Sequence, residues 1–272
     1  MIHTAPIILN QGEGPTTQAD RPIDVALTLS MADLKAQFLD PESGVVRYKA
    51  MRGSEAFQGY EALALGLKAF DPGRLADRGQ RLAFWINIYN TAVIHGIIRL
   101  GLERSVKELP RFFHRMAYDI GGHLFSLNDM EHGVLRGNRR PPYALFKPFG
   151  SQDPRLELAV TPLDPRIHFA LVCGARSCPP IGFYEADRVD SQLQLAAESF
   201  VNSPQVEIMP QEGVMLLSKI FQWYRADFGG SKLTLIRTIL QFLDDGEKKD
   251  FLMKRGDGIK IRYKPYDWSL NE

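Results

Sequence analysis

The stretch from Leu82 to Leu100 restricts the fold more than any other part of the sequence. It is the longest apolar stretch in the chain, yet Asn87, Asn90 and other polar side chains interrupt it. A membrane span needs roughly 20 predominantly apolar residues, which this stretch does not supply. Gly101 follows directly, and glycine is the residue that most often ends a helix in a left-handed conformation. We therefore expect a long helix over residues 81–100, buried by the rest of the chain, and no membrane span.

The composition indicates a soluble globular protein without a polyanionic partner. Of the 272 residues, 44% are hydrophobic and 24% are charged, which is ordinary for a globular chain. Thirty-three Lys and Arg against 32 Asp and Glu leave a formal net charge of +1, so nothing in the charge favours nucleic acid or an anionic membrane. The partner we expect is a small molecule or a peptide. The sequence carries no signal for an oligomeric state.

The chain divides into a short arm and one domain. Residues 1–22 contain glycines and prolines with little periodicity, and we expect them to form a flexible N-terminal arm. Over residues 23–272 no linker interrupts the apolar pattern, so we expect one globular domain. Periodicity and turn residues predict further helices at residues 27–38, 55–70, 126–136, 187–200, 218–228 and 234–243.

Strands are expected mainly as hairpins. Turn signals place two hairpins and a late strand at residues 116–125, 206–217 and 259–263. The apolar run Ile167–Val172 does not alternate, which is typical of a strand buried on both faces at the centre of a sheet. Because helices dominate and do not alternate strictly with strands, the fold class is α+β. We expect a helix-rich single domain around a small mixed sheet with hairpins.

Cys173 and Cys178 are the only cysteines, and they lie in one short loop after the expected strand. They cannot link distant elements, so they do not form a disulfide framework of the secreted type. Cys178 lies close to Arg176, whose positive charge favours a thiolate, whereas Cys173 continues the strand into the core. We expect Cys178 to be the more reactive thiol. The alternative is that both are buried small hydrophobic residues.

His132, on the expected helix after the first hairpin, is the candidate general base because imidazole titrates near neutrality. Its neighbour Glu131 could orient it, although adjacent helical residues point about 100° apart. His168 is the second choice as base, because its position in the expected strand suggests a packed ring. A histidine satisfied within the core or at the surface is the alternative for His132.

Polar residues lie on one side of the long helix, among them Asn87 and Asn90, with Trp85 close by in sequence. Unpaired burial costs roughly 1–3 kcal/mol per polar group, so these side chains need polar partners. We expect them to face a polar cavity and to bind a ligand. A hydrogen-bonded network that only fixes helix packing is the alternative.

No cofactor and no metal are expected. The chain lacks the glycine-rich loops that bind nucleotides and the His-Glu-x-x-His motif of zinc hydrolases. A zinc site would need the two cysteines together with two of the histidines at residues 123, 132 and 168, and that combination has no recognised ligand spacing.

Five segments together resemble domain-of-unknown-function family 547, found in bacteria and plants. They are Phe84–Asn90, Ser126–Arg136, Pro165–Pro180, Trp223–Phe228 and Tyr266–Asn271. The family has no established activity, so the resemblance bears on the fold more than on the function. Many bacterial members of the family resemble exported proteins. Because residues 1–10 lack the pattern of a signal peptide, we expect a cytoplasmic protein, unless a signal peptide precedes this sequence.

The function that these residue types favour is a thiol-dependent hydrolase or acyl transferase. Such an enzyme needs a thiolate, a base and an oxyanion donor. Cys178 or Cys173 supplies the thiolate, His132 with Glu131 supplies the base, and Asn87 or Asn90 supplies the oxyanion donor. The residues expected to bind substrate are Trp85, Asn87, Asn90, His168 and Arg176. The alternative is a non-catalytic module that binds a small ligand or peptide in the same pocket, and a purely structural protein is the third possibility weighed.

Overall fold

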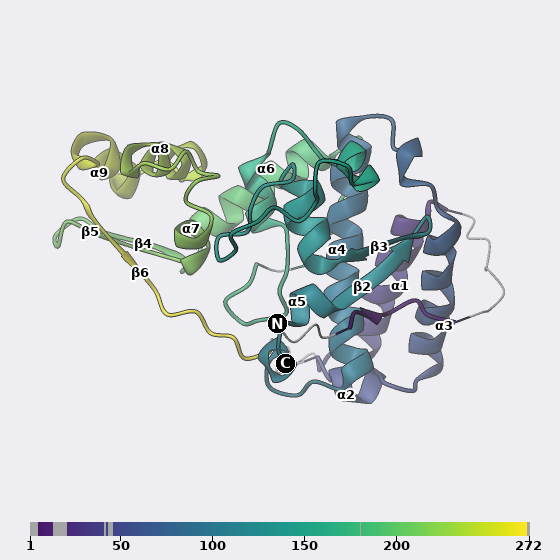
Figure 1. Ribbon diagram of the computed structural model, residues 1–272. Coiled ribbons are helices and arrows are strands. Elements are labelled where there is room, and N and C mark those ends of the chain that lie inside the picture. The colour runs from purple at the N-terminus through teal and green to yellow at the C-terminus, as the bar shows by residue number, and fades with distance from the viewer. Residues whose placement is uncertain (1–4, 13–20, 41, 43–45, 180, 271–272) are drawn as a thin grey trace.

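The long helix α4 (Arg78–Leu100) runs through the middle of the larger part of the protein (Figure 1). The structure is a computed structural model, and it describes residues 5–12, 21–40, 42, 46–179 and 181–270. The Asp77 side chain caps its start by accepting from the Gln80 N–H, and Gly101 ends it with a φ of 62°. Every residue from 82 to 98 is buried. The predicted buried helix is confirmed. Within the described residues, no helix combines the length and the apolar character that a bilayer crossing requires.

Helices α1 (Ile23–Phe38), α2 (Tyr48–Met51) and α3 (Glu55–Ala64) pack on one side of α4 or on each other, and a small sheet lies on another side (Figure 1). That sheet has the order β1 (Ile7–Ile8), β2 (Met116–Ile120) and β3 (His123–Ser126). The turn between β2 and β3 needs two residues with positive φ, which Gly121 and Gly122 provide. The first predicted hairpin is therefore confirmed.

Within the expected arm, the described residues 5–12 include a short strand. Strand β1 pairs in parallel with β2, and the Asn10 side chain exchanges hydrogen bonds with the backbone of Asp119 at 2.8 and 2.9 Å. Leu9 and Asn10 are buried. Residues 7–10 therefore belong to the fold, because β1 extends the hairpin of β2 and β3 to a three-stranded sheet. The expected boundary between the arm and the domain, at residue 22, stays a prediction.

The second sheet has the order β4 (Val206–Met209), β5 (Val214–Leu217) and β6 (Lys260–Tyr263). Strands β4 and β5 form the second predicted hairpin, and β6 adds in parallel to β5. Helices α8 (Lys232–Phe242) and α9 (Glu247–Arg255) lie over this sheet (Figure 1). The strands thus form two mixed sheets where one was expected.

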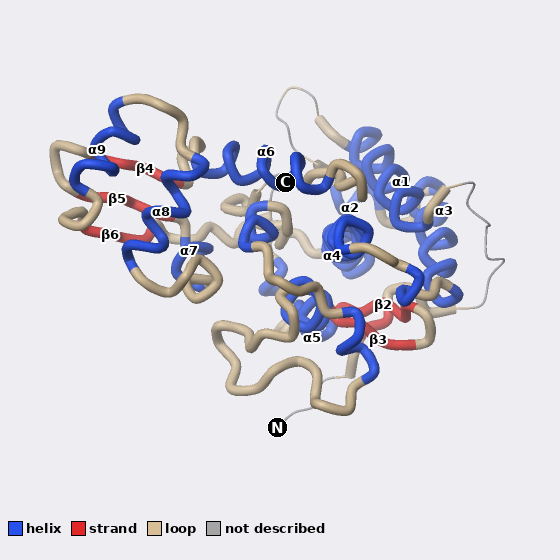
Figure 2. Tube along the Cα trace, turned by 90° about the horizontal axis from the view of Figure 1, so that it is seen from above, coloured by secondary structure: helices blue, strands red, loops and turns tan. Residues whose placement is uncertain are grey.

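The remaining helices are short, except for α6. They are α5 (Phe112–Arg115), α6 (Val189–Val201), α7 (Lys219–Trp223), the 3-10 helices Leu65–Ala69, Pro72–Arg74, Val106–Glu108, Pro154–Leu158 and Pro165–Phe169, and the π-helix Asp129–Leu135. Figure 2 shows α6 running from the part around α4 to the part around the second sheet. The buried side chains form a larger cluster around α4 and a smaller one around the second sheet. The first residues of α6 pack in the larger cluster and its last residues in the smaller one. The helix therefore joins the two clusters, and the α+β fold class of one domain is confirmed.

The prediction of a central strand at Ile167–Val172 is wrong. The segment begins as the 3-10 helix Pro165–Phe169, and neither sheet includes it. Asp164 caps this helix by accepting from the Arg166 N–H, and Pro165 occupies the first helical position, where its missing N–H costs nothing. An apolar run without alternation fits a buried strand or a buried helical turn equally well. The run is buried, as expected, but as a turn between the two clusters.

Candidate functional site

A cavity of about 290 Å³ opens between the two parts of the domain. Seven separate segments of the chain contribute to its walls, and most of the side chains are aromatic or apolar. The lining residues are Tyr89, Phe113, Glu131, Pro142, Tyr143, His168, Leu171, Val172, Cys173, Cys178, Ile220, Trp223, Tyr224, Tyr266 and Trp268. A concave apolar site with a few polar groups is the usual form of a small-molecule pocket. The cavity therefore brings both cysteines together with His168 and Glu131.

The two thiols lie against each other and against one tyrosine. Cys178 Sγ accepts from the Cys173 backbone N–H, and Cys173 Sγ is 3.1 Å from the Tyr266 hydroxyl oxygen. The loop between the thiols turns at Gly174, which has a φ of 77°. A Cβ atom there would come within 2.6 Å of Ile97, so the tight turn that brings the sulfurs together requires glycine.

The surroundings of the two sulfurs favour Cys173 over Cys178 as the thiolate. Hydrogen bonding from the Cys178 thiol lowers the pKa of Cys173 against the opposing effect of burial, helped by the Tyr266 hydroxyl and the Ala175 N–H. Burial and then the Cys173 sulfur raise the pKa of Cys178 well above its usual value. The choice of Cys178 from the sequence is thus reversed. Arg176, expected to activate it, has an exposed side chain.

His168 is oriented by a buried carboxylate. Its Nε2 lies 2.9 Å from Asp227 Oδ2, and its ring stacks on Tyr224 with centroids 3.8 Å apart. Because an ionised carboxylate only accepts hydrogen bonds, Nε2 carries the proton and Nδ1 of the neutral ring has a free lone pair. Burial lowers the pKa of His168, which Asp227 partly offsets. The ring is therefore neutral near physiological pH, and it is packed, as the sequence predicted, although it also lines the cavity.

Asp227 is held ionised although its side chain is fully buried. Burial opposes ionisation, but hydrogen bonds from His168 and Arg136 hold its pKa well below the usual value. Arg136 donates two hydrogen bonds, at 2.7 and 3.0 Å, and Arg139 a third. Sequence analysis did not identify Asp227 as a site residue, since 59 positions separate it from His168 and no motif connects them.

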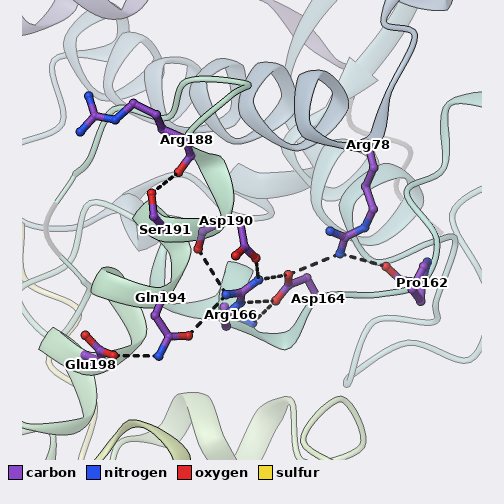
Figure 3. Close-up of polar contacts among 9 residues, drawn as sticks. All are labelled: Arg78, Pro162, Asp164, Arg166, Arg188, Asp190, Ser191, Gln194 and Glu198. Atoms are coloured by element: carbon purple, nitrogen blue, oxygen red, sulfur yellow. Dashed lines mark hydrogen bonds and ion pairs between the residues drawn. The ribbon is translucent and has the colours of Figure 1, made fainter.

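The segment that carries His168 is fixed by ion pairs on its outer side. Figure 3 shows the Arg166 guanidinium between the carboxylates of Asp164 and Asp190, at 2.8 and 2.5 Å. Arg78, at the start of α4, reaches Asp164 as well. These contacts connect the 3-10 helix to α4 and α6, and so define the position of His168 in the cavity.

Glu131 and His132 lie on the π-helix, which the predicted Ser126–Asp129 capping box begins. The Arg136 N–H donates to the Glu131 carbonyl, five residues back, at 2.8 Å. Glu131 lines the cavity and accepts from the Tyr224 hydroxyl at 2.5 Å. Wide helical turns of this kind are frequent at functional sites.

The structure does not favour His132 as the base. Its Nδ1 lies 2.9 Å from an Arg136 guanidinium nitrogen, which can only donate, so Nδ1 has no proton and its lone pair is used. Burial lowers the pKa of His132 to about 4. His132 is also absent from the lining of the cavity. His168, the second choice from the sequence, is the histidine that the cavity contains.

Residues 73–201 match the model of a family described as "Protein of unknown function, DUF547". The resemblance seen in the sequence is confirmed. No curated protein and no solved structure matches the chain. The segment matching family 547 includes Glu131, His168, Cys173 and Cys178, but it ends before Asp227 and before the lining residues of the C-terminal part. The cavity is therefore built only when both parts of the chain fold together.

Within the family 547 segment, Asn87 and Asn90 hold backbone and do not line the cavity. The Asn87 amide donates to the Tyr184 carbonyl at 2.8 Å and accepts from its N–H at 3.1 Å. Trp85 packs in the core against Phe84 and Phe125. Because both asparagines bond to backbone, the contacts favour the alternative of a network that fixes helix packing. Within the described residues, no three His, Cys, Asp or Glu side chains are grouped so as to hold a metal ion.

Asn90 has the most consequential of these contacts. It donates to the Ala170 carbonyl at 3.0 Å and accepts from the Val172 N–H at 2.9 Å. Asn90→Leu should lower the free energy of unfolding by about 2–5 kcal/mol, because two buried backbone groups lose their partners. Urea denaturation measures this change, and the exposed Gln211→Leu is the control, expected to have little effect. Equal stability of the two variants would contradict the structural role of Asn90.

Proposed function

We propose that the protein is a thiol-dependent hydrolase or acyl transferase, with Cys173 as nucleophile and His168 as general base. One observation carries the proposal: a cysteine whose pKa is lowered by its neighbours lines the same cavity as a histidine whose Nε2 is held by a buried aspartate. A nucleophile, a base and a group that orients the base are the parts that covalent acyl transfer requires. Asp227 is the orienting group, and it replaces Glu131 in that role.

The reaction proceeds in two steps. His168 takes the proton of the Cys173 thiol and becomes an imidazolium, and the thiolate attacks the carbonyl carbon of an ester, thioester or amide. The bond to the leaving group then breaks as that group takes the proton from the imidazolium. Water or a second nucleophile then loses a proton to His168, attacks the acyl carbon and releases the Cys173 thiolate. Burial raises the pKa of Tyr266, so its hydroxyl stays protonated and can donate to the oxyanion. Asn87 and Asn90, expected as oxyanion donors, are occupied by backbone.

Iodoacetamide labelling of the native protein from about pH 5 to pH 9 tests the nucleophile, because only thiolates alkylate rapidly. We expect Cys173 to label about tenfold faster than Cys178 at neutral pH, with a midpoint below the usual thiol value of 9.0. Peptide mass spectrometry resolves the two sites. In the unfolded protein both cysteines should label at similar rates, which provides the control.

Two further variants sharpen the labelling experiment. Cys178→Ser keeps a hydroxyl donor next to Cys173 and should preserve its rapid labelling. Asp227→Asn removes the charge that supports His168 and should slow turnover of an activated ester more than labelling. Faster labelling of Cys178, or labelling of either cysteine only after unfolding, would contradict the proposal. The latter outcome would favour a non-catalytic module that binds a ligand in the same cavity.

A further inference from the structure

We infer that the cavity recognises a substrate bearing an alkylammonium group, held by the Glu131 carboxylate among aromatic rings. The inference deepens the proposed function, on which it rests for the reaction that follows binding. The recognition itself depends on groups other than the thiols, and it can be measured without them.

Glu131 is a buried negative charge with unused acceptor capacity. Its side chain is 11% exposed, and it accepts from Tyr224 at 2.5 Å and from Tyr89 at 3.3 Å. A carboxylate has about four lone-pair sites, so about two remain for a ligand. Burial opposes ionisation, but the hydrogen bond from Tyr224 and the charge of Arg136 help to hold the pKa of Glu131 below its usual value. The group is therefore an anion at neutral pH.

Three aromatic rings of the same cavity form a cluster. They belong to Trp223, Tyr266 and Trp268, and their ring centroids are 4.8 to 5.8 Å apart. Aromatic faces attract cations, and desolvated cavities strengthen that attraction. The Lys107 ammonium nitrogen already lies 4.2 Å from the centroid of the Trp268 ring, although Lys107 itself is outside the cavity. Rings and carboxylate thus favour the same ligand charge.

Among the residues that the structure describes, no lysine or arginine lines the cavity to attract an anion instead. The guanidinium groups of Arg136 and Arg139 pair with Asp227. The negative charge of Glu131 also raises the pKa of Cys173, so the two groups interact electrostatically. A substrate whose ammonium group lies near Glu131 would have its acyl carbon within the same small cavity as the Cys173 sulfur. Amino-acid esters and choline esters both have this form.

Isothermal titration calorimetry of the native protein with choline and with 3,3-dimethyl-1-butanol tests the charge requirement, since the two probes differ in the quaternary nitrogen. We expect choline to bind at least about tenfold more tightly than its neutral counterpart. Glu131→Gln keeps the shape and, through its amide oxygen, can keep the hydrogen bond from Tyr224, and it should reduce this preference to about threefold or less. Glu212→Gln, on the exposed turn between β4 and β5, is the matched control and should keep the preference.

Two further ligands separate the sources of the ammonium group. Tighter binding of tetramethylammonium than of ethylammonium identifies a quaternary substrate, and the reverse order a primary amine; either order supports the inference. If Glu131→Gln does not fold, Trp268→Leu should weaken tetramethylammonium binding several-fold. Equal binding of choline and the neutral alcohol overturns the inference, as does a full preference in folded Glu131→Gln. Iodoacetamide labelling of Cys173 without ligand reports on the proposed function alone, so the two can fail separately.

Discussion

Replacing Asp227 by Asn should lower the free energy of unfolding by about 3–5 kcal/mol, one of the two largest effects we expect. The carboxylate pairs with Arg136 through two hydrogen bonds, and the side chains are 0% and 4% exposed, respectively. Removing the charge leaves the guanidinium buried without its counterion. The amide oxygen of Asn can still accept from His168, so the loss comes mainly from the arginine. Urea denaturation measures the change.

The matched control for Asp227→Asn is Asp245→Asn. Asp245 pairs with Lys249 on α9, but its side chain is almost fully exposed. Exposed pairs contribute little, so this variant should unfold at the same urea concentration as the unmodified protein. Comparable stability of the two variants would show that Arg136 finds another partner when Asp227 is neutral.

Lowering the pH from about 6.5 to about 4 should cost the protein about 3 kcal/mol of stability through His132 alone. Burial lowers the pKa of His132 to about 4 in the folded state, whereas the unfolded chain protonates near 6.5. Between these values the unfolded state binds more protons, so acid favours unfolding. The stability is fully present above pH 6.5 and is lost as the pH falls toward 4. Burial lowers the pKa of His168 as well, and the effect has the same sign.

The unfolding free energy measured at several pH values tests this window, and His132→Gln identifies the residue responsible. Glutamine keeps an oxygen that can accept from Arg136 but does not titrate, so the slope between pH 6.5 and 4 should become shallower. The exposed His123, replaced by Gln, is the control and should keep the slope. An unchanged slope in His132→Gln would assign the acid sensitivity to other groups.

Local signals in the sequence were sufficient for the elements that short-range chemistry defines. Gly121-Gly122 predicted the first hairpin, because only glycine adopts the required positive φ at no cost. Gly101 predicted the end of α4, and the Ser126–Asp129 spacing predicted the start of the next helix. The same reasoning failed at Ile167–Val172, since an apolar run of that length does not distinguish a strand from a helical turn.

The candidate site was only partly visible in the sequence. The pattern identified the two cysteines, Glu131 and His168 as residues of interest. It could not say which thiol is the stronger acid, because that depends on how the folded loop places Cys178 against Cys173, on burial, and on Tyr266, a residue 93 positions away from Cys173. The order of preference between the two histidines changed for the same reason: Arg136 donates to Nδ1 of His132, whereas Asp227 accepts from Nε2 of His168.

The sequence by itself determined the α+β class, the buried helix α4 and the presence of a polar loop with two thiols, because these depend on neighbours within a few residues. Only the tertiary structure decided which polar groups face the cavity and which hold backbone. Asn90 and Glu131 are both buried polar residues, and one of them fixes a loop while the other lines the cavity. Burial penalises every unpaired polar group, so the partner found across the fold assigns the role of each.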